Sequence, residues 1–574
     1  MNTISTKSRS KKQKSGKPGA TTTRLDDAQV SPPGELSQRT WYLTAGAILL
    51  LGSFLRLFKL TLVPFHHDEG VNGNFLVTLV REGKYFYDPQ NYHGPTLYYF
   101  SAVIPWLVRF FGGKAAGDNY GLTTFNIRLV TVLFGIGTIW LALTLRKRIG
   151  TVGALCAAGL IAISPGAIYL SRYFIHESLF VFFTLAIVVA SLQYYDSGRS
   201  VYLILASVAT ALMVATKETW IINGPVLLIA LVSTLVYFRL RASFNRTTEQ
   251  VPVAEKLRET IDRFGGPIPL LTVALTAFAV FIVVAVLFYS SFFTNYPKGV
   301  SDAFKTLNLW RQRTHEHEHP WYQYAWWLLR EEGALMVLAG FGALIALWRA
   351  DNRLGLFLAL WSFGLLTAYS IAGMSLSRMF SDFIFHRTIT EQTYKTPWIS
   401  LNFIVPLALT SGYLLEIVYQ KLREFRQPLL FLVLPLAIMA LCGYQVYQLN
   451  FVHYDDDQLP YVYAHTKRQM LTMLDEIERI SEQHGTGTDT GIAIVSPDYW
   501  PLPWYFRNYK KVGYYSSIVP TNEPIIIGSE AQEEQLNITY GDRYDKVNSG
   551  LEDGAYPLRP GVDLLLYVRR DVKR

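Results

Sequence analysis

Apolar runs of about twenty residues recur along this chain from Trp41 to Asn450, and each is long enough to cross a bilayer as a helix. Only 17% of the 574 residues are charged, against about 25% in soluble proteins. The chain is therefore predicted to be a polytopic α-helical membrane protein. The eleven predicted spans are residues 41–60, 124–145, 151–170, 177–195, 200–217, 221–238, 268–290, 334–349, 354–373, 397–418 and 428–449.

The chain divides into three predicted parts. Residues 1–40 form a basic tail that is expected to be disordered. Residues 41–450 form the transmembrane domain, and residues 61–123 are its long first outer loop. Residues 451–574 have the composition of a small soluble α/β domain. Its predicted helix and strands are Thr466–Gln483, Ile492–Val495, Pro524–Ile527 and Asp563–Val568.

The basic residues predict the orientation in the membrane. With eleven spans, the lysine-rich tail and five short basic loops fall on one side, which the positive-inside rule makes the cytoplasmic side. The C-terminal domain then lies outside. The net charge of +9 is accordingly a topology signal, so no nucleic-acid partner is expected.

Cys156 and Cys442 both lie within spans, so no disulfide framework is expected.

The segment Thr96–Gly112 is apolar enough to be counted as a twelfth span. A twelfth span would, however, move the basic loop at residues 146–148 and every later loop to the opposite side. The segment is therefore predicted to be a helix on the membrane surface. Val71–Arg81 is predicted to be a second surface helix, because its apolar residues recur at helical spacing.

Two adjacent carboxylates, Asp68 and Glu69, follow the first span by a few residues. A carboxylate at the outer surface can deprotonate a hydroxyl or hold a metal while a lipid-borne substrate keeps its tail in the bilayer. The alternative is structural, with Asp68 capping the surface helix that follows. A second polar and aromatic patch in the same loop, Tyr92-His93-Gly94-Pro95, favours the functional interpretation.

Further charged residues lie at the outer ends of later spans. Glu177 has Arg172 close by in the sequence, so the two can either bind substrate or form an ion pair that anchors a helix end. Lys217 and Glu218 sit between two spans with almost no loop. A mutual salt bridge is one interpretation of that pair, and neutralisation of a lipid phosphate by Lys217 is the other.

The last outer loop is basic although the topology signal favours few basic residues there. Arg378 and Lys395 are its candidates for binding a phosphate group. Another outer loop contains His315, His317 and His319, whose spacing differs from that of zinc hydrolases. The functional alternative for this loop is a metal site, and the other is that a His-rich loop binds metal only adventitiously.

Taken together, these short motifs resemble the large membrane glycosyltransferases of the GT-C fold, close to the protein O-mannosyltransferases and the lipid A aminoarabinose transferases. Within them the chain looks most similar to the prokaryotic family described as flippase activity-associated proteins, which is linked to archaeal-type glycosylation. The segments that carry the resemblance are Asp68-Glu69, Tyr92-His93-Gly94-Pro95, Ser164-Pro165 with Arg172 and Glu177, His319-Pro320-Trp321-Tyr322, Tyr394-Lys395-Thr396-Pro397-Trp398 and Trp500-Pro501-Leu502-Pro503-Trp504-Tyr505.

The resemblance implies transfer of a sugar, on the outer face and with inversion, from a polyprenyl-phosphate donor. Asp68 is then the general base and Glu177 the second acidic position. The acceptor is a glycan, a lipid or a protein, and membrane lipids surround the enzyme. His93 and Gly94 stand where the aminoarabinose transferases have an acidic and a basic residue before proline. The expected substrate-binding residues are Glu69, His93, Arg172, Glu177, Lys217, Arg378 and Lys395.

The departing phosphate of such a donor needs positive charge. Lys217, Arg378 and Lys395 are candidates to supply it, and so is a divalent metal ion held by His93. Two other functions stay open. A non-catalytic flippase or assembly partner for lipid-linked sugars should have polar residues along its spans, whereas here they gather at one face. An oligosaccharyltransferase should carry a Trp-Trp-Asp-Tyr-Gly motif, which is absent from the sequence.

Overall fold

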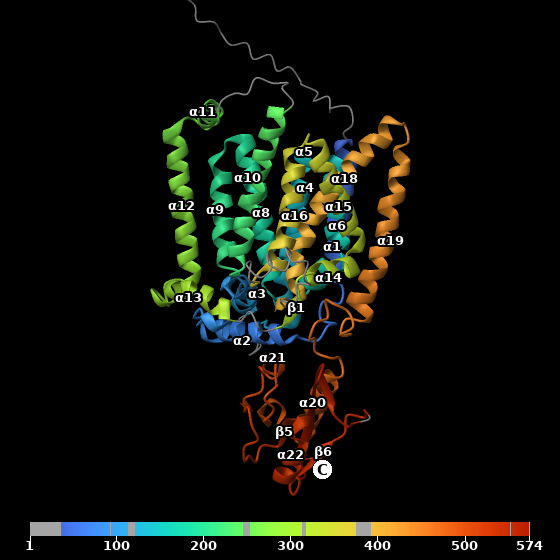
Figure 1. Cartoon of the computed structure of the whole chain (residues 1–574). Coiled ribbons are helices and arrows are strands. Elements are labelled where there is room, and N and C mark those ends of the chain that lie inside the picture. Colours follow the sequence, from blue (N-terminus) through green and yellow to red (C-terminus); the bar gives the residue numbers. More distant parts are fainter. Residues whose placement is uncertain are drawn as a thin grey trace, which may run out of the picture.

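A computed structural model of the chain describes residues 36–91, 93–112, 121–244, 253–312, 317–374, 392–551 and 553–572. It consists of a helical bundle with a separate C-terminal domain at one end (Figure 1). The bundle helices are α1 (Gln38–Leu57), α4 (Thr124–Thr144), α5 (Arg146–Ile149), α6 (Thr151–Ile163), α7 (Pro165–Ser171), α8 (Glu177–Ser197), α9 (Ser200–Val214), α10 (Trp220–Phe244), α12 (Pro267–Tyr289), α15 (Gly333–Arg349), α16 (Arg353–Ile371), α18 (Leu401–Glu424) and α19 (Val433–Tyr447).

All eleven predicted spans coincide with helices of the bundle. Among the described residues, eight helices are long and apolar enough to cross a membrane, and up to ten if each of two bent pairs forms one span. The bent pairs are α6 with α7, at an angle of 59°, and α14 (Gln323–Glu331) with α15, at 112°. The remaining helix, α9, is apolar but has only 15 residues. The chain is thus a multi-pass membrane protein.

The bend between α6 and α7 explains two buried charged residues that the bundle contains. Pro165 has no N–H, so the carbonyl of Ile161 lacks its partner in the helix. The buried guanidinium of Arg56 donates to that carbonyl at 2.9 Å. The buried carboxylate of Glu332 accepts the N–H of Gly166 at 2.8 Å, at the start of α7. Both groups stabilise the broken helix and leave its backbone satisfied.

Small residues allow the most buried span, α18, to pack closely against α6. A Cβ atom added to Gly412 would lie 2.4 Å from the carbonyl oxygen of Gly153, so the two backbones touch where glycine stands. Close approach at small residues is a common mode of helix packing in membranes. The pair α6–α18 therefore forms the centre of the bundle, around which the more exposed helices α12 and α19 lie at the rim (Figure 1).

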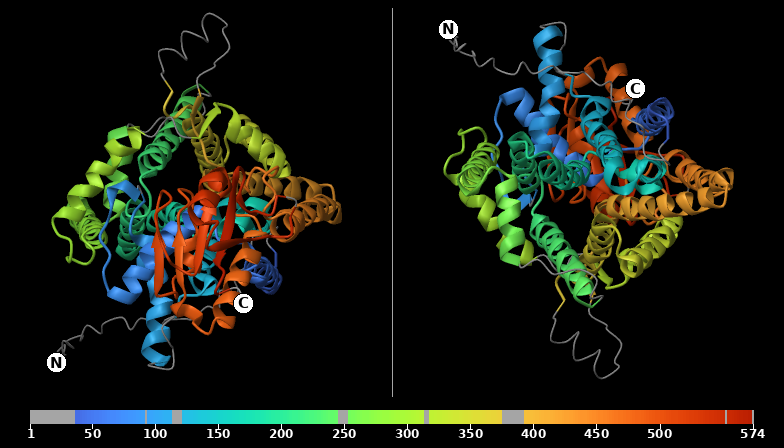
Figure 2. Two further views of the ribbon diagram at one scale, coloured as in Figure 1. Left: turned by 90° about the horizontal axis from the view of Figure 1, so that it is seen from below. Right: turned by 90° about the horizontal axis from the view of Figure 1, so that it is seen from above.

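The two predicted surface helices are present as α2 (His67–Glu82) and α3 (Thr96–Gly112). In Figure 1 α2 runs across the end of the bundle that faces the C-terminal domain, and in the axial views of Figure 2 α3 (light blue) is seen lengthwise. Both helices therefore lie across the direction of the spans. This confirms that Thr96–Gly112 is not a twelfth span. Two more helices outside the bundle proper are α11 (Val253–Arg263) and α13 (Lys298–Gln312).

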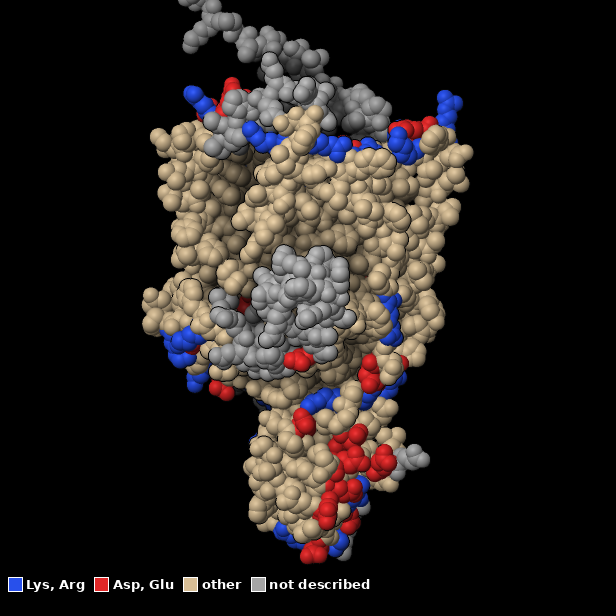
Figure 3. Space-filling view, in the orientation of Figure 1, with Lys and Arg blue, Asp and Glu red and all other residues tan. Residues whose placement is uncertain are grey.

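The charged side chains have the distribution expected of a membrane protein. On the face shown in Figure 3, Lys and Arg gather at the end of the bundle opposite the C-terminal domain, and the belt below them carries almost no charge. Asp and Glu are frequent on the C-terminal domain in the same view. An uncharged belt is what contact with lipid requires, and a basic rim at one end agrees with the loops from which the orientation was predicted.

The C-terminal domain is an α/β unit, as predicted. Its six-stranded sheet has the order β4-β3-β5-β8-β6, with β7 paired to β8. Strands β3, β4 and β5 run parallel, whereas β8 is antiparallel to β5, β6 and β7. The elements are α20 (Met470–Gln483), β3 (Gly491–Ile494), α21 (Leu502–Tyr505), β4 (Lys511–Tyr514), β5 (Ile525–Ser529), α22 (Glu533–Tyr540), β6 (Tyr544–Val547), β7 (Tyr556–Arg559) and β8 (Val562–Arg569).

Both faces of this sheet are covered, because side chains alternate along each strand. Ile492 and Ile494 belong to the core that includes α20, whereas Ala493 and Val495 pack with Leu536 of α22. Strands buried on both faces read as continuous apolar runs, which is why β3, β5 and β8 were predictable. The more polar strands β4, β6 and β7 were not predicted.

Candidate active site

A cavity of about 550 Å³ lies where the helix α2, the C-terminal domain and the ends of several spans nearest that domain meet. The loop of residues 61–123, the turn before α8 and the segment around Tyr394 all contribute to it. The charged and imidazole side chains that line it are His66, His67, Asp68, His93, Glu177, Lys217, Glu218, His317 and Arg559. Its aromatic lining residues are Tyr324, Tyr369, Tyr394, Trp398 and Tyr463.

Asp68 is placed at the cavity by the N-terminus of α2. The Nδ1 atom of His66 caps this helix by accepting the N–H of Asp68 at 3.0 Å, and the carboxylate of Glu69 accepts the N–H of His66 at 3.1 Å. Burial lowers the pKa of His66, which keeps its imidazole neutral and its Nδ1 atom free to accept. This reciprocal cap holds the start of α2 rigidly, while the Asp68 side chain stays 42% exposed.

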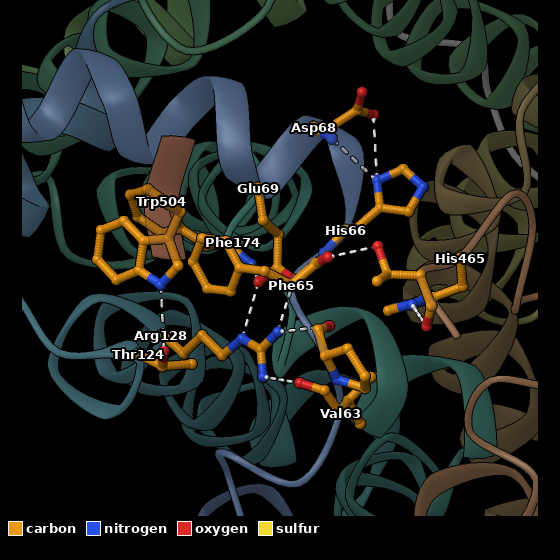
Figure 4. Close-up of polar contacts among 12 residues, drawn as sticks. Val63, Phe65, His66, Asp68, Glu69, Thr124, Arg128, Phe174, His465 and Trp504 are labelled. Carbon is orange, nitrogen blue, oxygen red and sulfur yellow. Dashed lines mark hydrogen bonds and ion pairs between the residues drawn. The ribbon is translucent and has the colours of Figure 1, made fainter. Parts of the chain in front are cut away.

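Glu69 points away from the cavity, contrary to its prediction as a substrate-binding residue. Its carboxylate is fully buried and forms a bidentate ion pair with Arg128 of α4, at 2.8 Å to Nε and 2.6 Å to Nη2 (Figure 4). The Oε1 atom also accepts the N–H of Phe174 at 2.7 Å. Arg128 in turn donates to the carbonyls of Leu60 and Val63. Glu69 therefore joins α2, α4 and the chain before α8.

The ends of the spans form the wall of the cavity nearest the bundle. Glu177 begins α8, and its buried carboxylate forms an ion pair with Lys217, which follows α9. Glu218 is also buried and lies 3.1 Å from Nδ1 of His93. A mutual salt bridge of Lys217 and Glu218, one of the two interpretations of this pair, is therefore wrong, because the two side chains contact different partners. The alternative pairing of Glu177 with Arg172 is likewise not what the structure shows.

Gly94 holds His93 against the turn between α9 and α10. The N–H of Gly94 donates to the carbonyl of Thr216 at 3.0 Å, and the hydroxyl of Thr96 donates to that of Thr216 at 2.8 Å. A Cβ atom added at Gly94 would lie 2.0 Å from the carbonyl oxygen of Ala215, so only glycine fits this contact. Gly94 stands where the aminoarabinose transferases have a basic residue, and this close contact explains why a larger side chain does not fit there.

We expect the substitution Gly94→Ala to destabilise the protein. Its methyl group would overlap a backbone carbonyl, which has to move, and overpacking of this kind costs about 1–3 kcal/mol. Gly159→Ala is a matched control, because that helical glycine has no atom within 4 Å of an added Cβ. The melting temperatures of the two purified variants in detergent would test this. Equal melting temperatures would mean that the turn adapts freely.

The C-terminal domain supplies one wall of the cavity and is docked on α2. Arg559 of β7 lines the cavity and pairs with Asp498. Phe65 stacks on Trp504 with ring centroids 4.7 Å apart. A Cβ atom at Gly70 would lie 2.6 Å from that of Pro501, so α2 and the domain touch at glycine. The motif around Trp500–Tyr505 therefore acts as a docking surface for the helix that carries Asp68.

Two other predicted substrate-binding residues, Arg172 and Lys395, do not line the cavity. Arg172 is buried, and its guanidinium donates to the carbonyls of Leu55 and Lys59, at the end of α1. Lys395 is also buried and donates to the carbonyl of His319 at 3.3 Å, and burial lowers its pKa to about 8. Strand β1 (Glu318–Pro320) and strand β2 (Gln392–Tyr394) pair next to it. Arg378 lies outside the described residues.

The donor set at His93 does not by itself make a metal centre. Within the described ranges, no group of three or more His, Cys, Asp or Glu side chains is arranged to hold a metal ion. The Nδ1 atom of His93 is engaged by Glu218, and the second close ring, that of His176, uses Nε2 to contact the carbonyl of Gly94. Several charged and imidazole side chains at the cavity were not among the predicted site residues, among them His66, His67, Glu218 and Arg559. Glu218 had been interpreted as half of a salt bridge, and Arg559 carried no local signal.

The chain is similar to known proteins in one part of its sequence and in its fold. Residues 102–246, about a quarter of the chain, match the family model described as dolichyl-phosphate-mannose-protein mannosyltransferase. No curated protein sequence matches the chain. The structure of ArnT from Cupriavidus metallidurans bound to undecaprenyl phosphate is similar, with a TM-score of 0.57 and 12% sequence identity, and the match covers 92% of this chain and 98% of that chain.

Two further structures are similar over most of the chain. ArnT from the same organism in the apo state has a TM-score of 0.54 and 14% identity, again with 92% of this chain and 98% of that chain covered. The oligosaccharyltransferase of Archaeoglobus fulgidus, in complex with zinc and sulfate, has a TM-score of 0.47 and 16% identity, over 85% of this chain and 68% of that chain.

The fold shared with ArnT shows that this chain has the GT-C fold, and the match over residues 102–246 to the mannosyltransferase family model agrees with a glycosyltransferase of that fold. This confirms the resemblance at the level of the fold and of the enzyme class. The narrower assignment to the family described as flippase activity-associated proteins stays a prediction.

Proposed function

We propose that this protein transfers a sugar from a polyprenyl-phosphate donor to an acceptor hydroxyl on the outer face of the membrane, with Asp68 as general base. One observation carries the proposal. Three carboxylates line the described cavity, and two of them, Glu177 and Glu218, are buried and paired with Lys217 and His93. Asp68 is half-exposed and has no Lys or Arg partner among the described residues, so it is free to accept a proton.

The nature of the donor is supported from two directions. The matching family is described by its use of dolichyl-phosphate mannose, and the similar ArnT structure holds undecaprenyl phosphate. Both compounds join a long isoprenoid to a phosphate. The cavity fits such a donor because one wall consists of span ends, where a phosphate lies at the headgroup level while its isoprenoid stays in the bilayer.

The proposed reaction is a single displacement. Asp68 takes the proton from the acceptor hydroxyl while that oxygen attacks the anomeric carbon and the bond from this carbon to the phosphate oxygen breaks. Attack and departure occur on opposite faces of the carbon, so its configuration inverts. The aromatic side chains around Tyr394 and Trp398 can stack on the sugar ring and orient it.

A transfer assay with the purified protein tests this function. Reconstituted protein would be incubated with radiolabelled dolichyl-phosphate mannose or undecaprenyl-phosphate sugars, together with membranes of the source cell as acceptor. Release of the lipid phosphate with transfer of label to the acceptor fraction is expected. Movement of label across the bilayer without release of the lipid phosphate would instead support the flippase alternative.

The proposed outer-face reaction requires the C-terminal domain to be outside the cell. A cysteine placed at Gln535, an exposed residue of α22, should react with a membrane-impermeant maleimide in intact cells. Ser243 is exposed at the end of α10 that lies away from the cavity, so a cysteine at this position should react only after the membrane is permeabilised. The native Cys442 is buried, so its background is expected to be low. The reverse labelling pattern would contradict the proposed orientation.

A further inference from the structure

His93 and Glu218 form a carboxylate–histidine pair that the function proposed above does not use. Nδ1 of His93 lies 3.1 Å from Oε2 of Glu218. Glu218 is only 5% exposed, whereas His93 is 30% exposed and lines the cavity. A buried carboxylate that accepts from Nδ1–H fixes the orientation of an imidazole. The opposite nitrogen, Nε2, is then the donor that remains for a ligand.

The pair lies on the side of the cavity where a donor phosphate belongs. His93 precedes the surface helix α3 and forms an isolated β-bridge with Lys217, which follows the span α9. Lys217 also lines the cavity, but it is paired with the buried carboxylate of Glu177. Its charge is therefore largely compensated before any substrate binds, so a phosphate that gains negative charge as it leaves needs a further donor.

We propose that His93 is the acid that protonates the leaving phosphate, and that Glu218 is the residue that positions it. This rests on the proposed function and adds the second proton transfer. As the bond from the anomeric carbon to the phosphate oxygen breaks, its electron pair stays on that oxygen, which takes the proton from Nε2 of His93. The acceptor proton goes to Asp68. The lipid leaves as a hydrogen phosphate, and solvent returns both side chains to their starting state.

The surroundings of His93 are compatible with this role. The groups that face it are the Glu218 carboxylate, the ring of His176 at 4.9 Å, and the ion pair of Lys217 with Glu177. The Gly94 contact with the turn at Ala215 fixes the backbone on one side of the imidazole. His93 is thus held by its neighbours on both sides, and its exposed edge faces the cavity.

Two substitutions separate the acid from the structural contact. In the variant His93→Asn, the side-chain amide nitrogen lies near the former position of Nδ1. The variant therefore keeps the hydrogen bond to Glu218 but has no group in place of Nε2. We expect this variant to keep the parental melting temperature and to lose about 10²-fold in kcat. His93→Ala should lose at least as much kcat, and added imidazole should restore part of it, because imidazole can occupy the vacated space and supply the proton.

A double-mutant cycle tests Glu218. Glu218→Gln should lower kcat less than His93→Asn, because an amide oxygen still accepts from Nδ1–H but carries no charge. The double variant should be no slower than His93→Asn alone, since Glu218 acts through His93. Imidazole should not rescue Asp68→Asn. Additive losses in the cycle would mean that Glu218 has a separate role and would overturn its assignment.

The outcomes distinguish this inference from the proposed function. Absence of lipid-phosphate release by the parental protein, with dolichyl-phosphate mannose and undecaprenyl-phosphate sugars alike, would overturn both. Transfer by the parent that is lost in Asp68→Asn but retained in His93→Asn would overturn the acid assignment alone. Parental activity that is abolished by EDTA and restored by zinc, with no imidazole rescue of His93→Ala, would also overturn it, because His93 would then hold a metal.

Discussion

Asp68→Asn is expected to lower kcat for sugar transfer by about 10²–10⁴-fold, which is the usual contribution of a general base. The amide has nearly the same shape as the carboxylate but cannot take up the acceptor proton. The protein should still fold and insert, because the Asp68 side chain is half-exposed and the cap of α2 uses its backbone N–H. Transfer from a radiolabelled polyprenyl-phosphate sugar, measured at saturating donor, checks the prediction.

Glu82→Gln is the matched control for this substitution. Glu82 is an exposed residue at the opposite end of the same helix, so the same chemical change there should leave kcat unaltered. The apparent KM for the donor should change little in Asp68→Asn, because the base contacts the acceptor. Transfer at the parental rate by Asp68→Asn would show that another group removes the proton.

The neighbouring substitution Glu69→Gln should act mainly on stability, with a large loss in the free energy of unfolding, whereas Asp68→Asn acts on kcat. It leaves the buried guanidinium of Arg128 without a counter-charge, and breaking one partner of a buried ion pair costs about 3–5 kcal/mol. Arg128→Met should cost a similar amount, because it strands the Glu69 carboxylate. Unfolding of the purified variants in detergent, followed by intrinsic fluorescence, measures the loss.

The double variant Glu69→Gln with Arg128→Met is the control for this pair. It removes both charges, so it should be more stable than the sum of the two single losses predicts. The fraction of Glu69→Gln protein that stays folded should lose transfer activity only to the extent that α2, and with it Asp68, is displaced. Stability equal to that of the parent in both single variants would mean that the ion pair does not hold α2 against α4.

The contrast between Asp68 and Glu69 could not be predicted from their adjacency. Successive residues of a helix point about 100° apart, so one can face a cavity while the next is buried. Which one is buried depends on Arg128, which lies 59 residues further along the chain. One signal was nonetheless present, because an arginine inside a predicted span needs a buried partner.

The spans and the surface helices were predictable because their patterns are local. Length and apolarity identify a span, and the positions of basic loops exclude Thr96–Gly112 from crossing. The pairings of Lys217 with Glu177 and of Glu218 with His93 depend instead on how separate spans meet. The same holds for Arg559, which reaches the cavity only because the C-terminal domain docks on α2.

The most direct test of the central claim is an experimental structure of Asp68→Asn protein in complex with an intact polyprenyl-phosphate sugar. The account predicts that the sugar occupies the cavity, with its anomeric carbon facing Asn at position 68 and open to an acceptor oxygen at about 3–3.5 Å. The phosphate should lie against the wall that contains His93 and Lys217. A donor bound elsewhere, with its anomeric carbon turned away from position 68, would contradict the account.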